Sequence, residues 1–384
     1  MRPIARATLA LAGFTFAACG AEQPSPQPPP PPPPAMTASA TPAETPAAPK
    51  PTQAELIQAT MKSFGEAMNG RDAAKVAALF APDGVWSLYG VVDLHGREAI
   101  QKNTEGWLDM STDQKGAPRR VFMKANTVVS EVVFAGTMTG DFMGMKATKK
   151  PFGVVDLIVM SFNDDGLIAS IHDYFDGAGF IAQIQGKKDA PPLAVPPAGA
   201  PEMHVAKGTP DEDKLVDWLK GTIDTFNKDD WKAMSPLFAT GGEVTFYMMG
   251  GKTIKAGKDL DKFHADVFKA VPNAKWAVTG AWGIDGYVVD ERTFTGTLKG
   301  HLGPVPPTNK DFISHIAEIV QPSSDGQYEH AWVYGNPMEI APPPPPPKAA
   351  PAAADMAKPK AAVAKPAAGA AAKPAAGAAA KPAK

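Results

Sequence analysis

The chain has 384 residues, a formal net charge of −2 and a single cysteine. A near-neutral chain lacks the surplus of basic residues that nucleic-acid binders carry, so we exclude nucleic acid as a partner. One cysteine excludes an internal disulfide framework, and the forty-one prolines gather in a few segments that divide the chain.

Residues 1–18 have the pattern of an export signal. Two arginines and no acid precede an apolar run, Ala7 to Ala18, which is too short to span a bilayer. Small residues stand directly before Cys19, as in the cleavage site of bacterial lipoproteins, although Phe16 replaces the usual leucine. We expect a lipid on Cys19 that holds the protein in the bacterial cell envelope. Gly20, in place of an acid, favours the outer membrane. An ordinary secretory signal with a chance cysteine is the alternative.

The local composition marks three proline-rich segments. Residues 19–52 and 187–211 read as linkers, and residues 342–384 form a tail of alanine, proline and lysine. Such segments cannot bury a core and are predicted to be disordered. The tail carries seven lysines against one acid, which suits weak binding to an anionic surface or a cell-wall polymer. A solvated spacer without a partner is the alternative.

The two remaining stretches, 53–186 and 212–341, repeat each other. The segment Phe134–Gly140 matches Phe294–Gly300 at an offset of 160 residues, and several later positions keep this offset. Each stretch has the length of one domain. We therefore predict two tandem copies of one fold.

Within each copy, helical periodicity comes first and strand periodicity follows. The elements expected in the first copy are a helix burying Ile57, Met61, Phe64 and Met68, a short helix over 73–80, a helix over 98–108, and strands over 128–136, 152–162 and 167–175. In the second copy, Leu215, Leu219 and Phe226 mark the first helix, followed by helices over 231–238 and 259–268. This order predicts the α+β class, with helices covering one face of a curved antiparallel sheet around a cone-shaped cavity.

Three segments carry a family resemblance: Leu94–Ile100, Thr137–Gly144 and His172–Gly186. Together they resemble the SnoaL-like polyketide cyclase branch of the nuclear transport factor 2-like superfamily. The resemblance covers most of 53–186, and in 212–341 it covers the fold but not the polar residues. The family contains ester cyclases, dehydratases, isomerases and ligand binders without activity, so the fold leaves the chemistry open.

Acidic residues on two neighbouring strands are the candidates for chemistry. Asp156 interrupts the apolar run Val154–Val159, and an acid there must face solvent, a partner or a cavity. A two-residue turn, with Phe162 opposite Leu167, would place Asp156 opposite Asp173 on one sheet face. When two carboxylates lie close together, the pKa of one of them is raised, so that this group can serve as a general acid near neutral pH. The alternative is a solvated sheet face.

Other residues complete the candidate site. A register slip of one residue would bring His172 or Tyr174 beside Asp156. The resemblance implies that Asp176, or its neighbour Asp173, is the general acid/base carboxylate. Trp86, Tyr89, Trp107 and Tyr174 are expected in the cavity wall, and His95 is a further ligand-binding candidate, although its place before a helix suits a cap. Histidine spacing predicts no metal site, and no motif predicts a cofactor.

The second copy lacks these acids. At the offset of 160, Asp156, His172, Asp173 and Asp176 become Ile316, Trp332, Val333 and Asn336. We therefore expect a degenerate domain that serves as a scaffold or forms an apolar pocket.

These observations favour a lipid-anchored protein whose two domains bind a hydrophobic small molecule without chemistry. One alternative is that the first domain is an acid/base ester cyclase or isomerase using Asp156, Asp173 and Asp176. Another is that the tandem is an interaction module of the cell envelope. Polar groups converging in the cavity would favour an enzyme, whereas purely apolar walls would favour a binder.

Overall fold

The computed structural model describes residues 50–228, 231–303 and 305–341. It contains two curved sheets, each with helices on one face, which confirms the α+β class. The signal sequence, Cys19, most of the first linker and the tail lie outside the described residues. Within the described part of the chain, no helix combines the length and the apolar character needed to cross a membrane.

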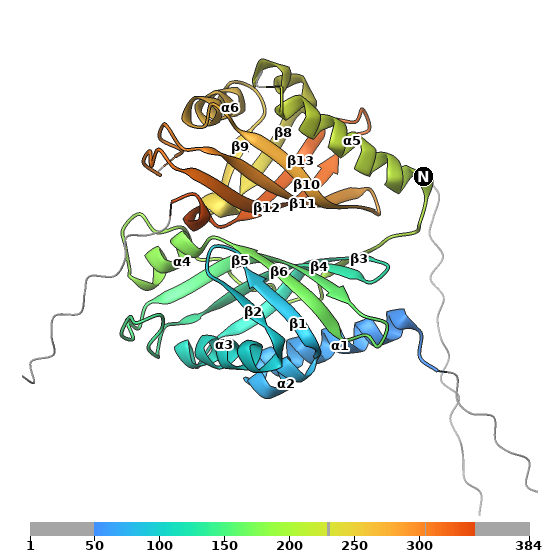
Figure 1. Cartoon of the computed structure of the whole chain (residues 1–384), viewed down its shortest axis with the longest axis vertical. Helices are drawn as coiled ribbons and strands as arrows, with labels where there is room; N and C mark the ends of the chain where they lie inside the picture. Colours follow the sequence, from blue (N-terminus) through green and yellow to red (C-terminus); the bar gives the residue numbers. More distant parts are fainter. Residues whose placement is uncertain (1–49, 229–230, 304, 342–384) are drawn as a thin grey trace, which may run out of the picture. The chain divides into compact units, whose positions relative to one another are not determined.

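The first domain consists of three helices, six strands and a closing helix. In chain order these are α1 (Gln53–Asn69), α2 (Ala73–Ala78), β1 (Phe80–Leu88), β2 (Val92–His95), α3 (Gly96–Met110), β3 (Lys115–Lys124), β4 (Thr127–Thr137), β5 (Pro151–Phe162), β6 (Ile168–Phe175) and α4 (Gly177–Ile184). The strands run in the order β2-β1-β6-β5-β4-β3. Figure 1 shows α1, α2 and α3 together on one face of this sheet.

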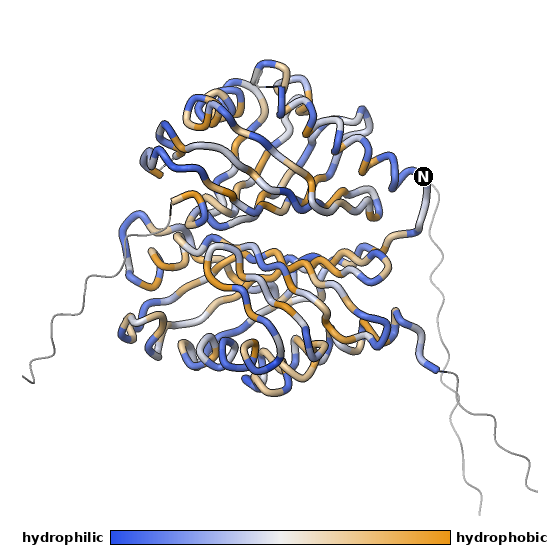
Figure 2. Tube along the Cα trace, viewed as in Figure 1, coloured by the Kyte–Doolittle hydropathy of each residue, from blue (hydrophilic) through white to orange (hydrophobic). Residues whose placement is uncertain are grey.

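Local sequence explains why α1 forms and how it faces the sheet. Thr52 and Glu55 form a capping box at its start, and Ile57, Phe64 and Met68 are buried along one side. In this domain apolar residues follow the strands, while the helices alternate apolar and hydrophilic residues (Figure 2). The helices therefore bury one stripe each against the concave face of the sheet.

The second domain repeats this order. Its elements are α5 (Pro210–Phe226), the short turns η1 (Trp231–Ala233) and η2 (Ser235–Leu237), β8 (Phe238–Phe246), η3 (Tyr247–Met249), β9 (Lys252–Lys255), α6 (Lys258–Ala270), β10 (Lys275–Ile284), β11 (Tyr287–Thr297), β12 (Asp311–Pro322), β13 (Tyr328–Gly335) and η4 (Pro337–Glu339). The sheet order β9-β8-β13-β12-β11-β10 corresponds strand for strand to the first sheet. The register also corresponds, since Asp156 pairs with Phe175 and Ile316 pairs with Gly335.

Three expectations from the sequence need correction. The helix expected over 73–80 ends at Ala78 because Phe80 already begins β1. The helix expected over 231–238 consists of two 3-10 turns, since Pro236 cannot donate the backbone bond that a continuous helix needs. The segment 187–211 is not wholly a linker: β7 (Glu202–Val205) pairs in parallel with β3 and satisfies that open sheet edge.

The convex faces of the two sheets form a shared apolar cluster. It contains Phe122, Val129, Val133, Leu157 and Val159 of the first domain and Ile284, Val289, Ala317 and Ile319 of the second. Because side chains alternate along a strand, the residues between these point to the concave faces. Each strand therefore serves the domain contact on one side and a cavity on the other.

Candidate active site in the first domain

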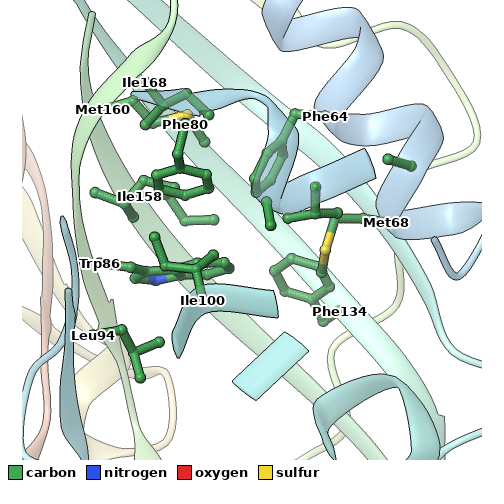
Figure 3. Packing of buried hydrophobic residues seen from close by; sticks show 14 of the residues in the cluster. Phe64, Met68, Phe80, Trp86, Leu94, Ile100, Phe134, Ile158, Met160 and Ile168 are labelled. Carbon is green, nitrogen blue, oxygen red and sulfur yellow. The ribbon is translucent and has the colours of Figure 1, made fainter. Parts of the chain in front are cut away.

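A cavity of about 650 Å³ lies between the helices and the concave face of the first sheet. Its wall is mainly aromatic and aliphatic, with Phe64, Met68, Trp86, Trp107, Phe134, Phe142, Phe175 and Phe180 among the lining residues. Figure 3 shows the inner part of this wall, where Phe64 and Met68 of α1 face Phe134 and Trp86 lies beside Phe80. A cavity of this size and character suits a drug-sized apolar molecule.

Two carboxyl groups lie in this apolar wall. Asp156 on β5 and Asp173 on β6 both line the cavity and are only 6% and 4% exposed. This excludes the solvated sheet face that the sequence left open. Apart from this pair, the polar lining comes from Lys102, Asn103, Thr104 and Asp141.

The strand register differs from the sequence-based expectation by two residues. Phe162 pairs with Ile168 and Asp173 lies opposite Ile158, while Asp156 lies opposite Phe175. One residue of the difference arises at the turn, where Phe162 pairs with Ile168 instead of Leu167, and the other arises at an irregularity in the pairing between Ser161 and Phe162. A register shift of two residues keeps both side chains on the same face of the sheet. Asp156 and Asp173 are therefore diagonal neighbours on the cavity side.

Burial and mutual repulsion govern the ionisation of the pair. Loss of hydration raises the pKa of Asp156 well above its usual range, and the charge of Asp173 raises it further. Burial also raises the pKa of Asp173, although hydrogen bonds from Asp156 and Trp86 oppose this effect. Asp156 is therefore the member of the pair that holds a proton more strongly, whereas Asp173, which receives the hydrogen bond of Trp86, ionises more readily.

Trp86 holds the carboxyl of Asp173 by a hydrogen bond. Its indole Nε1–H donates a buried hydrogen bond of 3.0 Å to Oδ2 of Asp173. The ring itself is stacked on Phe80, with centroids 5.9 Å apart, and also contacts Phe64. Sequence reasoning placed Trp86 in the cavity wall, but its hydrogen bond to the carboxylate needed the tertiary structure.

Asp176 does not belong to this cavity. Its Oδ1 accepts from the backbone N–H of Gly179 and caps α4, while its Oδ2 accepts from Gly250 of the second domain. Burial raises the pKa of Asp176 to about 6, but the group lies outside the lining of the first cavity. Of the two carboxyls that the family resemblance implies, Asp173 lines the first cavity, whereas Asp176 caps α4 and lines the second cavity.

His172, Tyr174 and Tyr89 lie at the domain contact instead of the cavity. His172 and Tyr174 alternate with Asp173 along β6, so their side chains leave the opposite face of the sheet. Both bond to Glu291 of the second domain at 2.7 Å. Tyr89 stacks on His315 with ring centroids 4.0 Å apart. The alternative register with a one-residue slip is thus absent, and these three residues do not line the first cavity.

The remaining candidates divide between surface and cavity. His95 is exposed at the start of α3, makes no side-chain cap bond there and does not line the cavity. Trp107 does line the cavity and contacts Phe142 and Phe180. Among the described residues, no group of three His, Cys, Asp or Glu side chains is arranged to hold a metal ion.

The concave face of the second domain is not purely apolar, contrary to the sequence-based expectation. Ile316 and Val333 do replace the two acids, and both line a cavity of about 690 Å³. Asp290, Arg292 and Glu318 form a buried ion network on the same face, and the last two line the cavity. The comparison at the offset of 160 missed them because they occupy positions that are Ser130, Val132 and Ile158 in the first domain. The two-residue spacing of Asp290 and Arg292 within an apolar strand was the available signal.

Residues 58–184 match the family of SnoaL-like polyketide cyclases. The first domain is therefore similar to this family. This finding confirms the resemblance that three segments of the first copy carry, and the family match ends before the second domain. No curated protein matches the chain.

Solved structures with similar folds each correspond to about one third of the chain. TsrD from Streptomyces laurentii is 22% identical and covers 34% of this chain and 94% of its own, with a TM-score of 0.31. IdmH from Streptomyces antibioticus is 25% identical and covers 34% and 98%, with a TM-score of 0.30. A protein with a ketosteroid isomerase-like fold from Catenulispora acidiphila, in complex with trimethylamine, is 20% identical and covers 33% and 92%, with a TM-score of 0.29.

Proposed function

We propose that the SnoaL-like domain is an acid/base enzyme that moves a proton next to the carbonyl group of an apolar molecule, as a cyclase or isomerase does. The observation that carries this proposal is the buried pair of Asp156 and Asp173 in the wall of an apolar cavity. A simple binder of hydrophobic molecules gains nothing from two like-charged groups there, because burying them is costly. The geometry therefore favours the enzymatic alternative over binding without chemistry.

The two carboxyls have complementary roles in this proposal. Ionised Asp173, held by the indole of Trp86, accepts the proton from the carbon beside the carbonyl. Protonated Asp156 donates a hydrogen bond to the carbonyl oxygen as negative charge develops there. Return of the proton from Asp173 to another carbon would complete an isomerisation. In a cyclisation, the enolate carbon would attack a second carbonyl, and the proton held by Asp173 would pass to the new alkoxide oxygen. The apolar wall keeps water away from the enol.

Deuterium exchange into a simple ketone tests the proposal. We would incubate the full chain with 2-tetralone in D₂O and follow loss of the signals of its α-hydrogens by NMR. The wild type should accelerate exchange above buffer, and Asp173→Asn should lower the rate by about a hundredfold or more, in the range of general acid–base catalysis. Asp156→Asn should also lower it. Asp165→Asn, at an exposed turn position, is the control and should exchange like the wild type.

Two outcomes would contradict enzymatic chemistry. Binding of 2-tetralone without any exchange would indicate that the domain binds apolar molecules without catalysing proton transfer. Equal exchange rates in the wild type and in Asp173→Asn would show that the pair takes no part.

We also propose that the protein works in the bacterial cell envelope. Support comes from the sequence alone: the signal-like residues 1–18, the small residues before Cys19 and the proline-rich spacer that follows. The lysine-rich tail would add weak contacts with anionic lipid or cell-wall polymer. Salt-dependent pelleting of the full chain with cell-wall sacculi or anionic vesicles, compared with a chain ending at Ile340, tests the tail.

A further inference from the structure

The second domain contains a cavity as large as that of the first, with a volume of about 690 Å³. Aromatic and aliphatic residues dominate its wall, among them Phe226, Phe246, Phe263, Trp276, Phe294 and Val333. The stack of Trp276 on Phe294, with centroids 4.8 Å apart, gives the wall a flat aromatic surface. Most of its lining residues lie outside residues 58–184, the segment that matches the SnoaL-like family, although Asp176, Ala178, Gly179 and Ala182 of that segment also line the cavity.

Charged side chains interrupt this apolar wall. Arg292 donates from Nε and Nη2 to the two oxygens of Asp290, both at 2.7 Å, and Nη2 also donates to Glu318. Arg292 and Glu318 line the cavity, whereas Asp290 is fully buried beyond it. The network is therefore one cation shared between two carboxyls at the cavity surface.

The first domain shows that the fold does not need this network. At the offset of 160, Asp290, Arg292 and Glu318 correspond to Ser130, Val132 and Ile158. Buried ion networks are expensive to desolvate, and apolar replacements are often neutral or stabilising. A charged cluster in the cavity wall, where the equivalent positions of the same chain are small or apolar, points to a role toward a ligand.

His264 gives an independent indication of a ligand. It projects from α6 into the cavity, is 9% exposed and lies among Phe226, Phe238 and Phe263. Within the described chain its Nδ1 has no hydrogen-bond partner. By contrast, Thr104 at the equivalent position of the first domain donates to the carbonyl oxygen of Ile100. A buried polar atom without a partner is costly unless a ligand supplies one.

The chemistry of these groups limits the class of ligand that the cavity can bind. Burial lowers the pKa of His264 to about 4, so its ring is neutral near pH 7 and offers one donor and one acceptor. A hydroxyl group both donates and accepts, and therefore matches either tautomer of the ring. A hydroxyl can likewise bond to the carboxyl of Glu318, which lines the same cavity, whether that group is protonated or ionised.

We propose that the second cavity is a separate binding site for a neutral, ring-containing apolar alcohol or phenol, held by His264 and the Arg292–Glu318 pair. The second domain is then a ligand-binding domain with its own specificity and does not serve only as a scaffold. This inference is independent of the chemistry proposed for the first domain, since it uses neither Asp156 nor Asp173, although Asp176 also lines the second cavity.

Tryptophan signals allow each cavity to be observed separately. The chain has seven tryptophans; Trp276 lines the second cavity, while Trp86 and Trp107 line the first. We would label the full chain with ¹⁵N-tryptophan, assign the indole signal of Trp276 with Trp276→Phe, and titrate with 1-naphthol and with naphthalene. The Trp276 signal should shift at about tenfold lower concentration of 1-naphthol than of naphthalene, as expected for one hydrogen bond to a buried group.

Variants of the polar groups complete the test. His264→Phe keeps an aromatic ring but removes its hydrogen bonding, so the affinity for 1-naphthol measured at Trp276 should fall to that for naphthalene. His301→Phe makes the same change at an exposed position of this domain and should bind like the wild type. If His264→Phe does not fold, Glu318→Gln replaces it and should weaken 1-naphthol binding severalfold. An unresponsive Trp276 signal, or an unchanged preference for 1-naphthol in the folded variant, would overturn the proposal.

Discussion

The hydroxyl of Tyr174, on β6 of the first domain, donates a hydrogen bond of 2.7 Å to Glu291, on β11 of the second. The residues at the offset of 160 make the same bond in the opposite direction between the domains: the hydroxyl of Tyr334, in the second domain, donates a hydrogen bond of 2.6 Å to Glu131, in the first. The contact between the domains therefore has the internal two-fold character of an isologous interface. The two halves have diverged in their surroundings, since Glu131 also bonds to Arg120 whereas Glu291 bonds to His172.

Removing these hydroxyls should destabilise the protein unequally. Tyr174→Phe leaves Glu291 with His172, and Tyr334→Phe leaves Glu131 with a guanidinium. We expect each change to lower the free energy of unfolding by about 1–3 kcal/mol, with Tyr174→Phe the more costly at neutral pH. Urea unfolding measures both. A larger loss for Tyr334→Phe would contradict this account of the interface.

The contribution of His172 should depend on pH. Its hydrogen bond to Glu291 raises the pKa of His172 in the folded protein. The stabilisation is therefore fully present below the unfolded pKa of about 6.5 and is lost as pH rises through the folded value. The difference in melting temperature between the wild type and His172→Gln should shrink from pH 6 to pH 9. A constant difference would show that the ring contributes only by packing.

The carboxyl pair should lower stability at high pH. Because the folded pKa values of Asp156 and Asp173 are raised, the folded state holds protons that the unfolded chain releases above about pH 4. The contribution of the pair to stability is thus greatest below that pH and declines as pH rises through the folded pKa values. Asp156→Asn should reduce the loss in unfolding free energy between pH 5 and 8 by roughly 1–3 kcal/mol. Asp165→Asn, measured in parallel, should leave the pH dependence as in the wild type.

Trp86 should act through the carboxylate it holds. Trp86→Phe preserves an aromatic ring against Phe80 but removes the hydrogen bond to Asp173. Since hydrogen bonds to charged groups contribute about 1.5–3 kcal/mol, the exchange rate with 2-tetralone should fall by roughly tenfold to a hundredfold. The apparent pKa of the rate profile should rise, because the ionised form loses its donor. An unchanged pH–rate profile with normal ketone binding would show that Trp86 takes no part in the proton transfer.

Cys19 should carry lipid in the native host. Cells fed an alkyne fatty acid and expressing the full chain should yield labelled protein, and Cys19→Ser should yield none, because this is the only cysteine of the chain. The unsubstituted chain is the positive control. Labelling of the serine variant would contradict lipidation at this position.

Several residues show why the site could be predicted only in part. Because Asp156 interrupts the apolar run Val154–Val159, it required an unusual environment, and the strand period placed Asp173 on the same sheet face of the neighbouring antiparallel strand. The choice between Asp173 and Asp176 was not available from the sequence. It depends on where β6 ends, since the last turn redirects Asp176 toward Gly250 in the other domain.

Sequence by itself determined the α+β order of elements and the presence of acids within apolar strand patterns, because these follow from the spacing of apolar and turn residues along the chain. Matching residues at an offset of 160 predicted the repeat. Only the tertiary structure decided which face of β6 lines the cavity and which meets the second domain. It also revealed that Arg292 and His264 give the second cavity a polar wall of its own. The physical reason is that a sheet buried on both faces has no polar side, so periodicity alone cannot tell a cavity from an interface.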